Sequence, residues 1–300
     1  MIKNFINFDD LSINDLQGII DRAISLKEEH KSGQINDSLQ NKTLAMIFDK
    51  SSTRTRVSFE AGMTQLGGQS LFLSDKDIQL GRGEPITDSA IVISSMVDAV
   101  MLRLSSHEDI IEFSKHSSKP VINALSDESH PCQILADLMT YQEIKGSIKN
   151  KKIAWVGDGC NVCQTYMQAA GIFDFELSIA TPDGYEPSEL FIGKYKKNIN
   201  FYSDPLIACK DADIIVTDVW TSMGQESEKK QRELAFTGFQ VNQNMMNQAK
   251  KDAVFMHCLP AYREKEVSSE VIDGNQSVVW SEAENRLHVQ KSLLLYLIGS

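Results

Sequence analysis

A dense cluster of hydroxyl residues and arginines separates an apolar run from a helical pattern. The run Thr43–Phe48 leads into Asp49–Arg56, where four hydroxyl residues and two arginines occur within six positions. A strand–turn–helix junction exposes N–H groups at the positive end of the helix dipole, and Arg54 adds a planar fork suited to phosphate oxygens. A capped helix with solvated arginines is the alternative, but the density of the cluster favours phosphate binding. No Walker lysine motif is present, which argues against a nucleoside triphosphate.

Two further residues suit stabilisation of a developing oxyanion. Arg103 lies near the end of the predicted strand Ala99–Leu104, and His130 lies between the predicted strand Val121–Leu125 and the predicted helix Cys132–Lys145. Both positions belong to the carboxyl edge of an open α/β sheet, where ligands bind. A histidine before a helix is usually a surface or capping residue. Beside Arg103 and a phosphate site, however, a role at a carbonyl oxygen is favoured.

The second half of the chain carries residues suited to an amine. Asp218 ends the predicted strand Ile214–Asp218 and could hold an ammonium group, although a helix cap followed by a loop is an equally good interpretation. His257 and Cys258 follow the predicted strand Ala253–Met256. A nucleophilic Cys–His pair is disfavoured there, because adjacent residues of an extended segment point to opposite sides.

Two other patterns are weaker. Gly157 and Gly159 follow a predicted strand, but Val162 occupies the third position of the dinucleotide-binding pattern, so NAD binding is disfavoured. Cys160 and Cys163 form a C-x-x-C pair without a second pair or a nearby histidine at ligand spacing, which disfavours zinc or redox chemistry. With five cysteines in total, reduced thiols are expected.

Short apolar runs and helical patterns must position these residues. The strand-like runs alternate with helical stretches, which indicates parallel sheets covered on both faces. We therefore predict an α/β protein of two doubly wound parallel-sheet domains, with the active site in the cleft between them. The predicted domains are 1–147 and 148–281, and the C-terminal helix 282–300 is expected to pack back on the first. The predicted strands are Thr43–Phe48, Ser70–Leu73, Ala99–Leu104, Val121–Leu125, Ile153–Val156, Glu176–Ala180, Ile199–Tyr202, Ile214–Asp218 and Ala253–Met256.

Composition sets limits on the class of protein. The chain has 300 residues, 42% of them hydrophobic and 24% charged, which suits two ordinary globular domains. Its formal net charge of −11 argues against a nucleic-acid partner. The sequence has no apolar run of about 20 residues, which argues against a membrane span. The first residues lack a secretory pattern, so we expect a cytoplasmic protein.

Several of these segments resemble one enzyme family. Ser52–Glu60 is similar to the carbamoyl-phosphate signature of the aspartate and ornithine carbamoyltransferases, and His130–Asp137 and His257–Pro260 are similar to later signatures of the ornithine members. Ser222-Met223-Gly224 is also typical of ornithine-specific members. The resemblance implies transfer of a carbamoyl group from carbamoyl phosphate to L-ornithine, giving L-citrulline and phosphate by direct attack of the neutral side-chain amine. It implies no metal or organic cofactor, and a homotrimer.

The resemblance also implies roles for individual residues. Catalytic roles fall on Arg54, Arg103, His130, Asp218, Cys258 and Arg286. Ornithine binding falls on Asn161, Asp218, Ser222 and Met223. Gln79 is implied to serve the phosphate site of a neighbouring subunit, whereas Arg56 is expected to support its loop. Carbamoyl phosphate binding falls on Ser52, Thr53, Arg54, Thr55, Gln79, Arg103, His130, Gln133, Cys258, Leu259 and Arg286.

Other functions stay open at this point. A carbamoyltransferase acting on N-acetylornithine or putrescine would share these motifs. A non-catalytic regulatory relative would be expected to lose Arg54, Arg103 or His130, and all three are present. An aspartate carbamoyltransferase would carry an arginine-bearing loop of the His-Pro-Leu-Pro type for the second carboxylate, and His257-Cys258-Leu259-Pro260 departs from it. The sequence leaves open whether citrulline is made or consumed.

Overall fold

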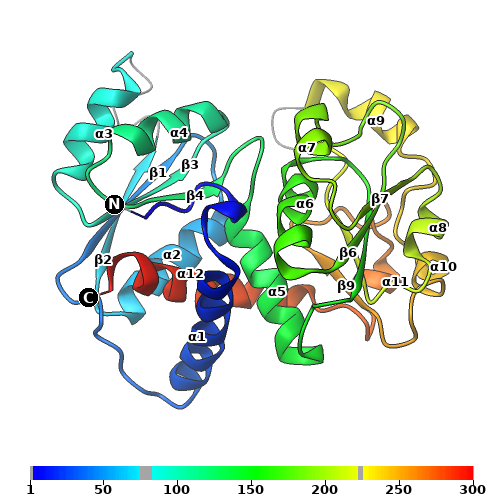
Figure 1. Ribbon diagram of the computed structural model, residues 1–300, viewed down its shortest axis with the longest axis horizontal. Helices are drawn as coiled ribbons and strands as arrows, with labels where there is room; N and C mark the ends of the chain where they lie inside the picture. Colours follow the sequence, from blue (N-terminus) through cyan, green and yellow to red (C-terminus); the bar gives the residue numbers. More distant parts are fainter. Residues whose placement is uncertain (1–2, 75–82, 222–225, 300) are drawn as a thin grey trace. The chain divides into compact units, whose positions relative to one another are not determined.

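The computed structural model describes residues 3–74, 83–221 and 226–299. It divides into two compact units (Figure 1). Unit 1 comprises Met1–Met139 and Glu284–Ser300, and unit 2 comprises Thr140–Ala283. The divisions fall within the helices α5 (Pro131–Lys145) and α12 (Val279–Ile298). Each unit contains one parallel sheet with helices, which confirms the predicted fold class of two parallel-sheet α/β domains.

The sheet of unit 1 brings two predicted site segments together. Its strand order is β2-β1-β3-β4, and all of its pairings are parallel. Phe48 at the end of β1 pairs with Arg103 at the end of β3. Arg103 therefore lies beside the segment that follows β1, at the carboxyl edge of the sheet. The strands are β1 (Thr43–Phe48), β2 (Gln69–Ser74), β3 (Ala99–Arg103) and β4 (Val121–Leu125).

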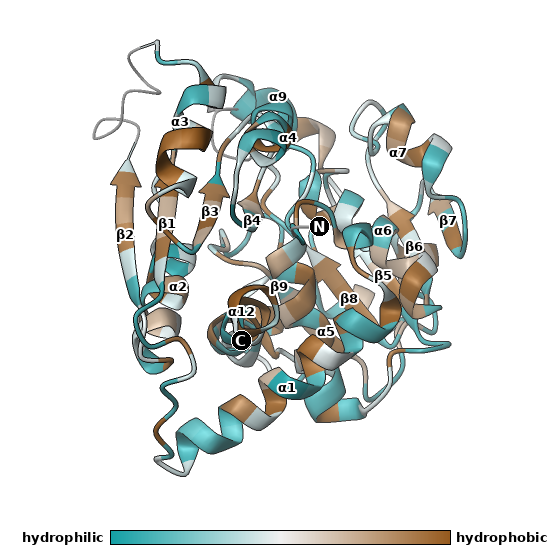
Figure 2. Cartoon of the chain, turned by 60° about the vertical axis from the view of Figure 1, so that its left-hand side comes forward, coloured by the Kyte–Doolittle hydropathy of each residue, from teal (hydrophilic) through white to brown (hydrophobic). Residues whose placement is uncertain are grey.

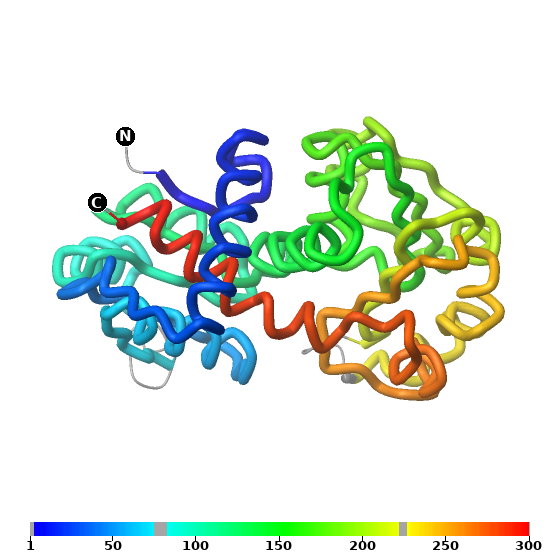
Figure 3. The backbone as a smooth tube through the Cα atoms, turned by 90° about the horizontal axis from the view of Figure 1, so that it is seen from below, coloured from blue at the N-terminus to red at the C-terminus, as the bar shows by residue number. Residues whose placement is uncertain are grey.

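Helices cover both faces of this sheet (Figure 1). On one face, Ile110 and Phe113 of α4 and Ala90 of α3 join a core with the inward residues of β1 and β3. On the other face lie α2, α12 and α1, and Figure 3 shows α1 (blue) running against α12 (red). The Ser292 hydroxyl of α12 donates to the Ile19 carbonyl of α1 at 2.7 Å. The helices are η1 (Phe8–Asp10), α1 (Ile13–Lys31), α2 (Thr53–Gln65), α3 (Ile86–Ser94) and α4 (His107–His116).

Helix α2 begins four residues earlier than the apolar pattern predicts. The pattern indicates a start at Val57, whereas the helix begins at Thr53. Ser52 is the cap residue, and its side chain accepts from the Thr55 N–H at 3.4 Å. Capping chemistry, and not burial of an apolar face, sets this start. Arg54 therefore lies in the first helical turn.

The sheet of unit 2 repeats the arrangement with five parallel strands. Its order is β7-β6-β5-β8-β9. The strands β5 and β8 are therefore neighbours, and the segments that follow them start side by side at the carboxyl edge. Thr217 at the end of β8 pairs with His257 at the end of β9. The next residues, Asp218 and Cys258, are therefore neighbours at the carboxyl edge. The strands are β5 (Lys152–Val156), β6 (Glu176–Ala180), β7 (Ile199–Tyr202), β8 (Ile214–Thr217) and β9 (Val254–His257).

The core of unit 2 contains the inner faces of its short helices. Ala208, Phe236 and Met246 cluster with Val156 and Ile215 of the sheet. Figure 2 shows hydrophobic residues concentrated on strands such as β1 and β8. Within the described residues, none of the helices is long and apolar enough to cross a membrane. The helices are α6 (Asn161–Phe173), α7 (Glu189–Lys194), α8 (Pro205–Cys209), η3 (Glu226–Glu228), α9 (Lys229–Ala235), α10 (Gln243–Met246) and α11 (Ser269–Ile272).

Candidate active site

Three elements of unit 1 meet at the hydroxyl of Thr55. Thr55 lies in the first turn of α2 and is buried. Its Oγ1 lies 3.3 Å from Nη1 of Arg103, at the end of β3, and 3.4 Å from Nη2 of Arg286, on α12. Ser52, Thr53 and Arg54 complete the same turn. Two guanidinium groups thus converge on a helix N-terminus, an arrangement that favours anion binding.

A chain of hydrogen bonds orients Arg286 and Gln133. Arg286 Nη1 donates to Gln133 Oε1 at 2.7 Å, and Gln133 Nε2 donates to Asp137 Oδ1 at 2.9 Å. These bonds fix which end of the Gln133 amide faces the arginine. With its oxygen toward the guanidinium, the Gln290 amide accepts from Nη2 of Arg286 at 3.0 Å and from Nε at 3.3 Å. Sequence reasoning missed Gln290, although it lies one helical turn after Arg286.

His130 is a neutral imidazole among positive charges. The side chain is buried, immediately before α5. Burial lowers the pKa of His130 well below its ordinary value, and the charges of Arg286, Arg103 and Arg54 lower it further. At neutral pH His130 therefore offers one N–H donor and one acceptor nitrogen, and not a cation. The three arginines thus act on His130 through their charges.

Arg56 has a different environment from Arg54. Its side chain is 46% exposed and pairs with Glu60 at 3.0 Å. Its guanidinium also lies over the Phe72 ring, 3.8 Å from the ring centroid. These contacts fit a supporting role in its segment, whereas Arg54 acts electrostatically on His130.

Asp218 is the centre of the candidate residues in unit 2. Its carboxylate is nearly buried and accepts from its neighbour's backbone, the Val219 N–H, at 2.7 Å. Cys258 Sγ lies 3.1 Å from Oδ1, and Cys160 Sγ lies 3.7 Å from Oδ2. Burial raises the pKa of both thiols well above the ordinary value, and the Asp218 charge raises it further. Both cysteines are therefore S–H donors at neutral pH, which argues against a thiolate nucleophile.

His257 does not point away from Cys258. Donor atoms of Asp218, His257 and Cys258 all lie within 4.8 Å of one another. The expectation that the two adjacent side chains face opposite sides was wrong, because β9 ends at His257 and the chain turns at Leu259, which has a positive φ of 57°.

The cluster around His257 has donor types that zinc prefers. Both of its ring nitrogens already have partners in the fold. Nε2 lies 3.2 Å from Glu266 Oε1, and Nδ1 accepts from the Leu259 N–H at 2.9 Å. A metal ion here would therefore displace one of these bonds, and the contacts themselves describe a hydrogen-bond network.

Asn161 is the first residue of helix α6 and follows Cys160 directly. Its Oδ1 accepts from the Val162 N–H at 2.9 Å, and Cys160 is the residue that caps the helix. The nearby Gly159 has a packing reason to be glycine, because a Cβ there would lie 2.1 Å from the backbone nitrogen of Pro187. This close approach explains the second glycine of the Gly-x-Gly pattern, and the positive φ of 137° explains the first, Gly157, without a dinucleotide.

Arg232 of α9 is a buried residue that sequence reasoning missed. Its Nη1 donates to Asp158 Oδ2 at 2.9 Å and to the Trp220 carbonyl at 2.8 Å, and its Nε lies 3.2 Å from Glu228. Burial raises the pKa of Asp158 to about 6, against the opposing effect of Arg232. No spacing or periodicity in the sequence distinguishes Arg232 from the charged residues around it.

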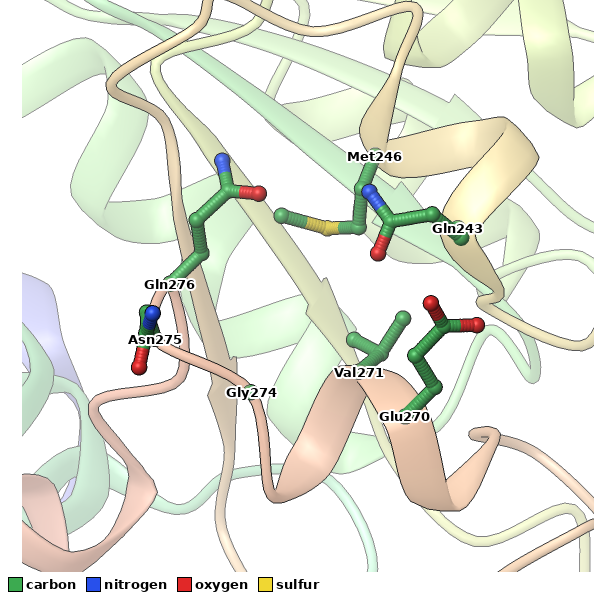
Figure 4. A pocket seen from close by; sticks show the side chains of 7 residues that line it. All are labelled: Gln243, Met246, Glu270, Val271, Gly274, Asn275 and Gln276. Carbon is green, nitrogen blue, oxygen red and sulfur yellow. The ribbon is translucent and has the colours of Figure 1, made fainter.

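Three predicted residues lie outside the part of the chain that the structure describes: Gln79, Ser222 and Met223. A separate pocket in unit 2 lies between α10, α11 and the segment 274–276 (Figure 4). None of the predicted site residues within the described ranges lines it. Its lining residues are Gln243, Met246, Glu270, Val271, Gly274, Asn275 and Gln276.

Comparison with known proteins identifies the family of the chain. The family model for the aspartate/ornithine carbamoyltransferase, carbamoyl-P binding domain, matches residues 3–143. The model for the Asp/Orn binding domain of the same family matches residues 149–297. The chain belongs to the aspartate/ornithine carbamoyltransferase family. This membership confirms the predicted class of enzyme, a carbamoyltransferase, and the resemblance on which that prediction was based.

Members of this family with similar sequences and structures are named for ornithine. The chain is 67% identical over 299 residues to the ornithine carbamoyltransferase of Ruthia magnifica subsp. Calyptogena magnifica, covering 100% of both chains. It resembles the solved ornithine carbamoyltransferase of Pyrococcus furiosus with a TM-score of 0.96 and 47% identity, covering 99% of this chain and 97% of that one. For the enzyme from Burkholderia thailandensis E264, the TM-score is 0.93 and the identity 48%, with 99% of each chain covered.

Proposed function

We propose that this protein is an ornithine carbamoyltransferase, which converts carbamoyl phosphate and L-ornithine into L-citrulline and phosphate. The observation that carries the proposal is the convergence of Arg103 and Arg286 on Thr55 at the N-terminus of α2, with His130 within their electrostatic reach. The names of its family members and their identity across the whole chain support the choice of ornithine.

Unit 1 is proposed to bind carbamoyl phosphate. The phosphate would accept N–H bonds from the first turn of α2 and charge-assisted bonds from Arg54 and Arg103. The carbonyl oxygen gains negative charge as the amine attacks, and Arg103, Arg286 and neutral His130 are proposed to stabilise it. Because Arg103 and Arg286 are held by hydrogen bonds before the substrate binds, little reorganisation of these two groups is needed in the transition state.

Unit 2 is proposed to bind ornithine. The Asp218 carboxylate can accept hydrogen bonds from the substrate's amine and stabilise the positive charge that grows on nitrogen during attack. The amine must attack as the free base, and Cys258 is a neutral neighbour that can position it. Asn161 is proposed to bind the α-carboxylate. Carbamoyl phosphate is proposed to bind first and ornithine second, and the predicted cleft between the domains stays a prediction.

The chemistry around Asp218 disfavours aspartate as the acceptor. A second carboxylate placed there would meet a carboxylate and two protonated thiols, and like charges at short range repel. Aspartate would require a cationic partner at that end of the site. N-acetylornithine and putrescine share the terminal amine but lack the free α-amino group or the α-carboxylate. They therefore test which groups at the α-carbon the site requires, including the proposed contact of Asn161 with the α-carboxylate.

The test is citrulline formation from carbamoyl phosphate with ornithine, N-acetylornithine, putrescine or aspartate as the acceptor. Turnover confined to ornithine is expected. Turnover with another amine would keep the chemistry and overturn the assignment of the acceptor. A folded protein that binds carbamoyl phosphate but turns over no acceptor would support the regulatory alternative.

We also propose that the protein is a cytoplasmic homotrimer of arginine metabolism, in which Gln79 serves the site of a neighbouring subunit. Two features of unit 1 support self-association. β2 is an edge strand, and Ile91, Val92 and Met96 expose apolar side chains in and just after α3. Light scattering should give three times the 33.6 kDa mass of one chain. A monomer that retains full activity would contradict the proposed donation of Gln79.

A further inference from the structure

Two cysteines from different elements approach the two oxygens of one carboxylate. Cys160 caps α6 and lies 3.7 Å from Oδ2 of Asp218, measured from Sγ. Cys258 follows β9 and lies 3.1 Å from Oδ1. The family resemblance implies a role for Cys258 but none for Cys160. All three residues belong to unit 2.

The sulfurs of Cys258 and Cys160 contact different oxygens of the Asp218 carboxylate. Oδ1 of Asp218 already accepts from the Val219 N–H at 2.7 Å as well as from Cys258. Cys160 is the neighbour on Oδ2. Rotation of a carboxylate about its last side-chain bond is soft, so a contact on only one oxygen leaves the other free to move. A donor on each oxygen fixes the plane of the carboxylate.

A thiol is a suitable donor for this position. Burial, and then the Asp218 charge, raise the pKa of Cys160, so the proton stays on sulfur at neutral pH. A thiol is a weak donor, and a carboxylate has about four lone-pair sites, so Oδ2 retains capacity for the substrate. A lysine or arginine at the same position would instead neutralise the charge that attracts the amine.

We propose that Cys160 is a positioning residue for the amine acceptor, and that its S–H group holds Oδ2 of Asp218 in the orientation that receives the substrate nitrogen. This inference rests on the proposed function. Cys160 does not itself react, and no covalent or redox step is involved. The consequence is a direct link between the N-terminus of α6, which begins at Asn161, and the aspartate after β8.

The kinetic test compares Cys160→Ala, Cys160→Ser and the matched control Cys163→Ala. Cys163 lies in α6 and is buried, and burial followed by the Asp158 charge raises its pKa. For Cys160→Ala we expect KM for the amine acceptor to rise about tenfold, with KM for carbamoyl phosphate within about twofold. Cys160→Ser keeps an O–H donor and should recover most of the loss. Cys163→Ala should leave both KM values near those of the unmodified protein.

Two outcomes would overturn the inference. Equal losses in the alanine and serine variants would show that the hydrogen bond is not responsible. Equal losses in Cys160→Ala and Cys163→Ala, accompanied by equal losses of thermal stability, would reduce Cys160 to a packing residue.

An infrared measurement separates this inference from the proposed function. The S–H stretching band that is lost in Cys160→Ala should shift in Asp218→Asn, whichever amine the enzyme uses. An unshifted band would refute the contact even in an active ornithine carbamoyltransferase. A shifted band in a protein inactive with ornithine would keep the contact and refute only the proposed acceptor, and the kinetic comparison would then use the amine that is turned over.

Discussion

The two units surround their candidate residues with charges of opposite sign. In unit 1, Arg54, Arg103 and Arg286 act on His130 and keep its imidazole neutral. In unit 2, the Asp218 carboxylate acts on Cys160 and Cys258 and keeps their thiols protonated. Burial is the larger cause in both cases, and the nearby charge adds to it. Each unit thus keeps its polar side chains as uncharged hydrogen-bonding groups beside fixed charges.

The buried arginines of the two units also differ in the charge of their hydrogen-bond partners. Arg103 and Arg286 of unit 1 hydrogen-bond to the neutral side chains of Thr55 and Gln133. Arg232 of unit 2 is paired with the carboxylates of Asp158 and Glu228. A hydrogen bond to a neutral group leaves the charge of the guanidinium in place, whereas a buried carboxylate at 2.9 Å compensates it. The comparison teaches that burial alone does not mark an arginine as functional, and that its partners decide.

The largest expected effect is on stability and concerns Arg232, the buried arginine that is paired with carboxylates. Arg232→Met leaves Asp158 buried without its partner, and we expect a loss of about 3–5 kcal/mol in the free energy of unfolding. Urea unfolding followed by circular dichroism measures it. The matched control is Arg263→Met, whose exposed pair with Asp273 should matter little. Equal losses in the two variants would break the distinction between buried and exposed pairs.

The next effect tests a functional arginine. Arg103→Gln removes a donor proposed to meet the carbonyl oxygen, and kcat should fall by about 10²–10³-fold. Stability should change less than in Arg232→Met, because the substitution leaves a neutral hydroxyl, and not a buried carboxylate, at the Thr55 contact. Arg56→Gln is the control, since Arg56 is exposed and paired with Glu60. Steady-state citrulline assays decide between them, and a similar loss of kcat in both variants would contradict the site geometry.

A smaller effect concerns the pH dependence of stability. Burial, then Lys291 and Lys27, lower the pKa of His288 in unit 1 to about 3. A depressed folded-state pKa means that the unfolded chain binds the proton first, so stability is retained above about pH 6.5 and falls toward pH 3. Between pH 7.5 and pH 5.0 this group should cost about 2 kcal/mol.

The variant that tests this effect is His288→Gln, compared with the unmodified protein by urea unfolding at both pH values. The variant should lose the contribution of His288 to the pH dependence, whatever its stability at pH 7.5. An unchanged difference between the two pH values would show that His288 is not the responsible group.

The smallest expected effect tests whether the arginine charges of unit 1 act on the pKa of His130. Three arginine charges lower the pKa of His130, and that of Arg286 has the largest effect. Arg286→Gln removes this charge. The pKa of His130 should therefore rise toward its ordinary value, which a chemical-shift titration of the imidazole can follow. Arg56→Gln is again the control and should leave the titration unchanged. A fall in the pKa of His130, or no movement, would show that Arg286 does not act on the imidazole.

Several features could be predicted from the sequence because the interactions that determine them are local. The strands β1, β4, β6 and β7 have the predicted bounds, because short runs rich in apolar residues are properties of neighbouring positions in the chain. The motifs around Arg54 and His130 likewise lie next to the strands and helices that position them. The start of α2 was missed because Ser52 determines it through a single capping bond.

By itself, the sequence determined the fold class, the strands and the family, because apolar periodicity and motifs are properties of neighbouring residues. Only the tertiary structure showed what is brought together from distant positions. Arg286 meets Thr55 across 231 positions of the chain, and Cys160 meets Asp218 across 58. The neutral states of His130 and Cys258 follow from burial and from charges on other elements. No local pattern encodes them, since they depend on which side chains the folded chain places within a few ångströms.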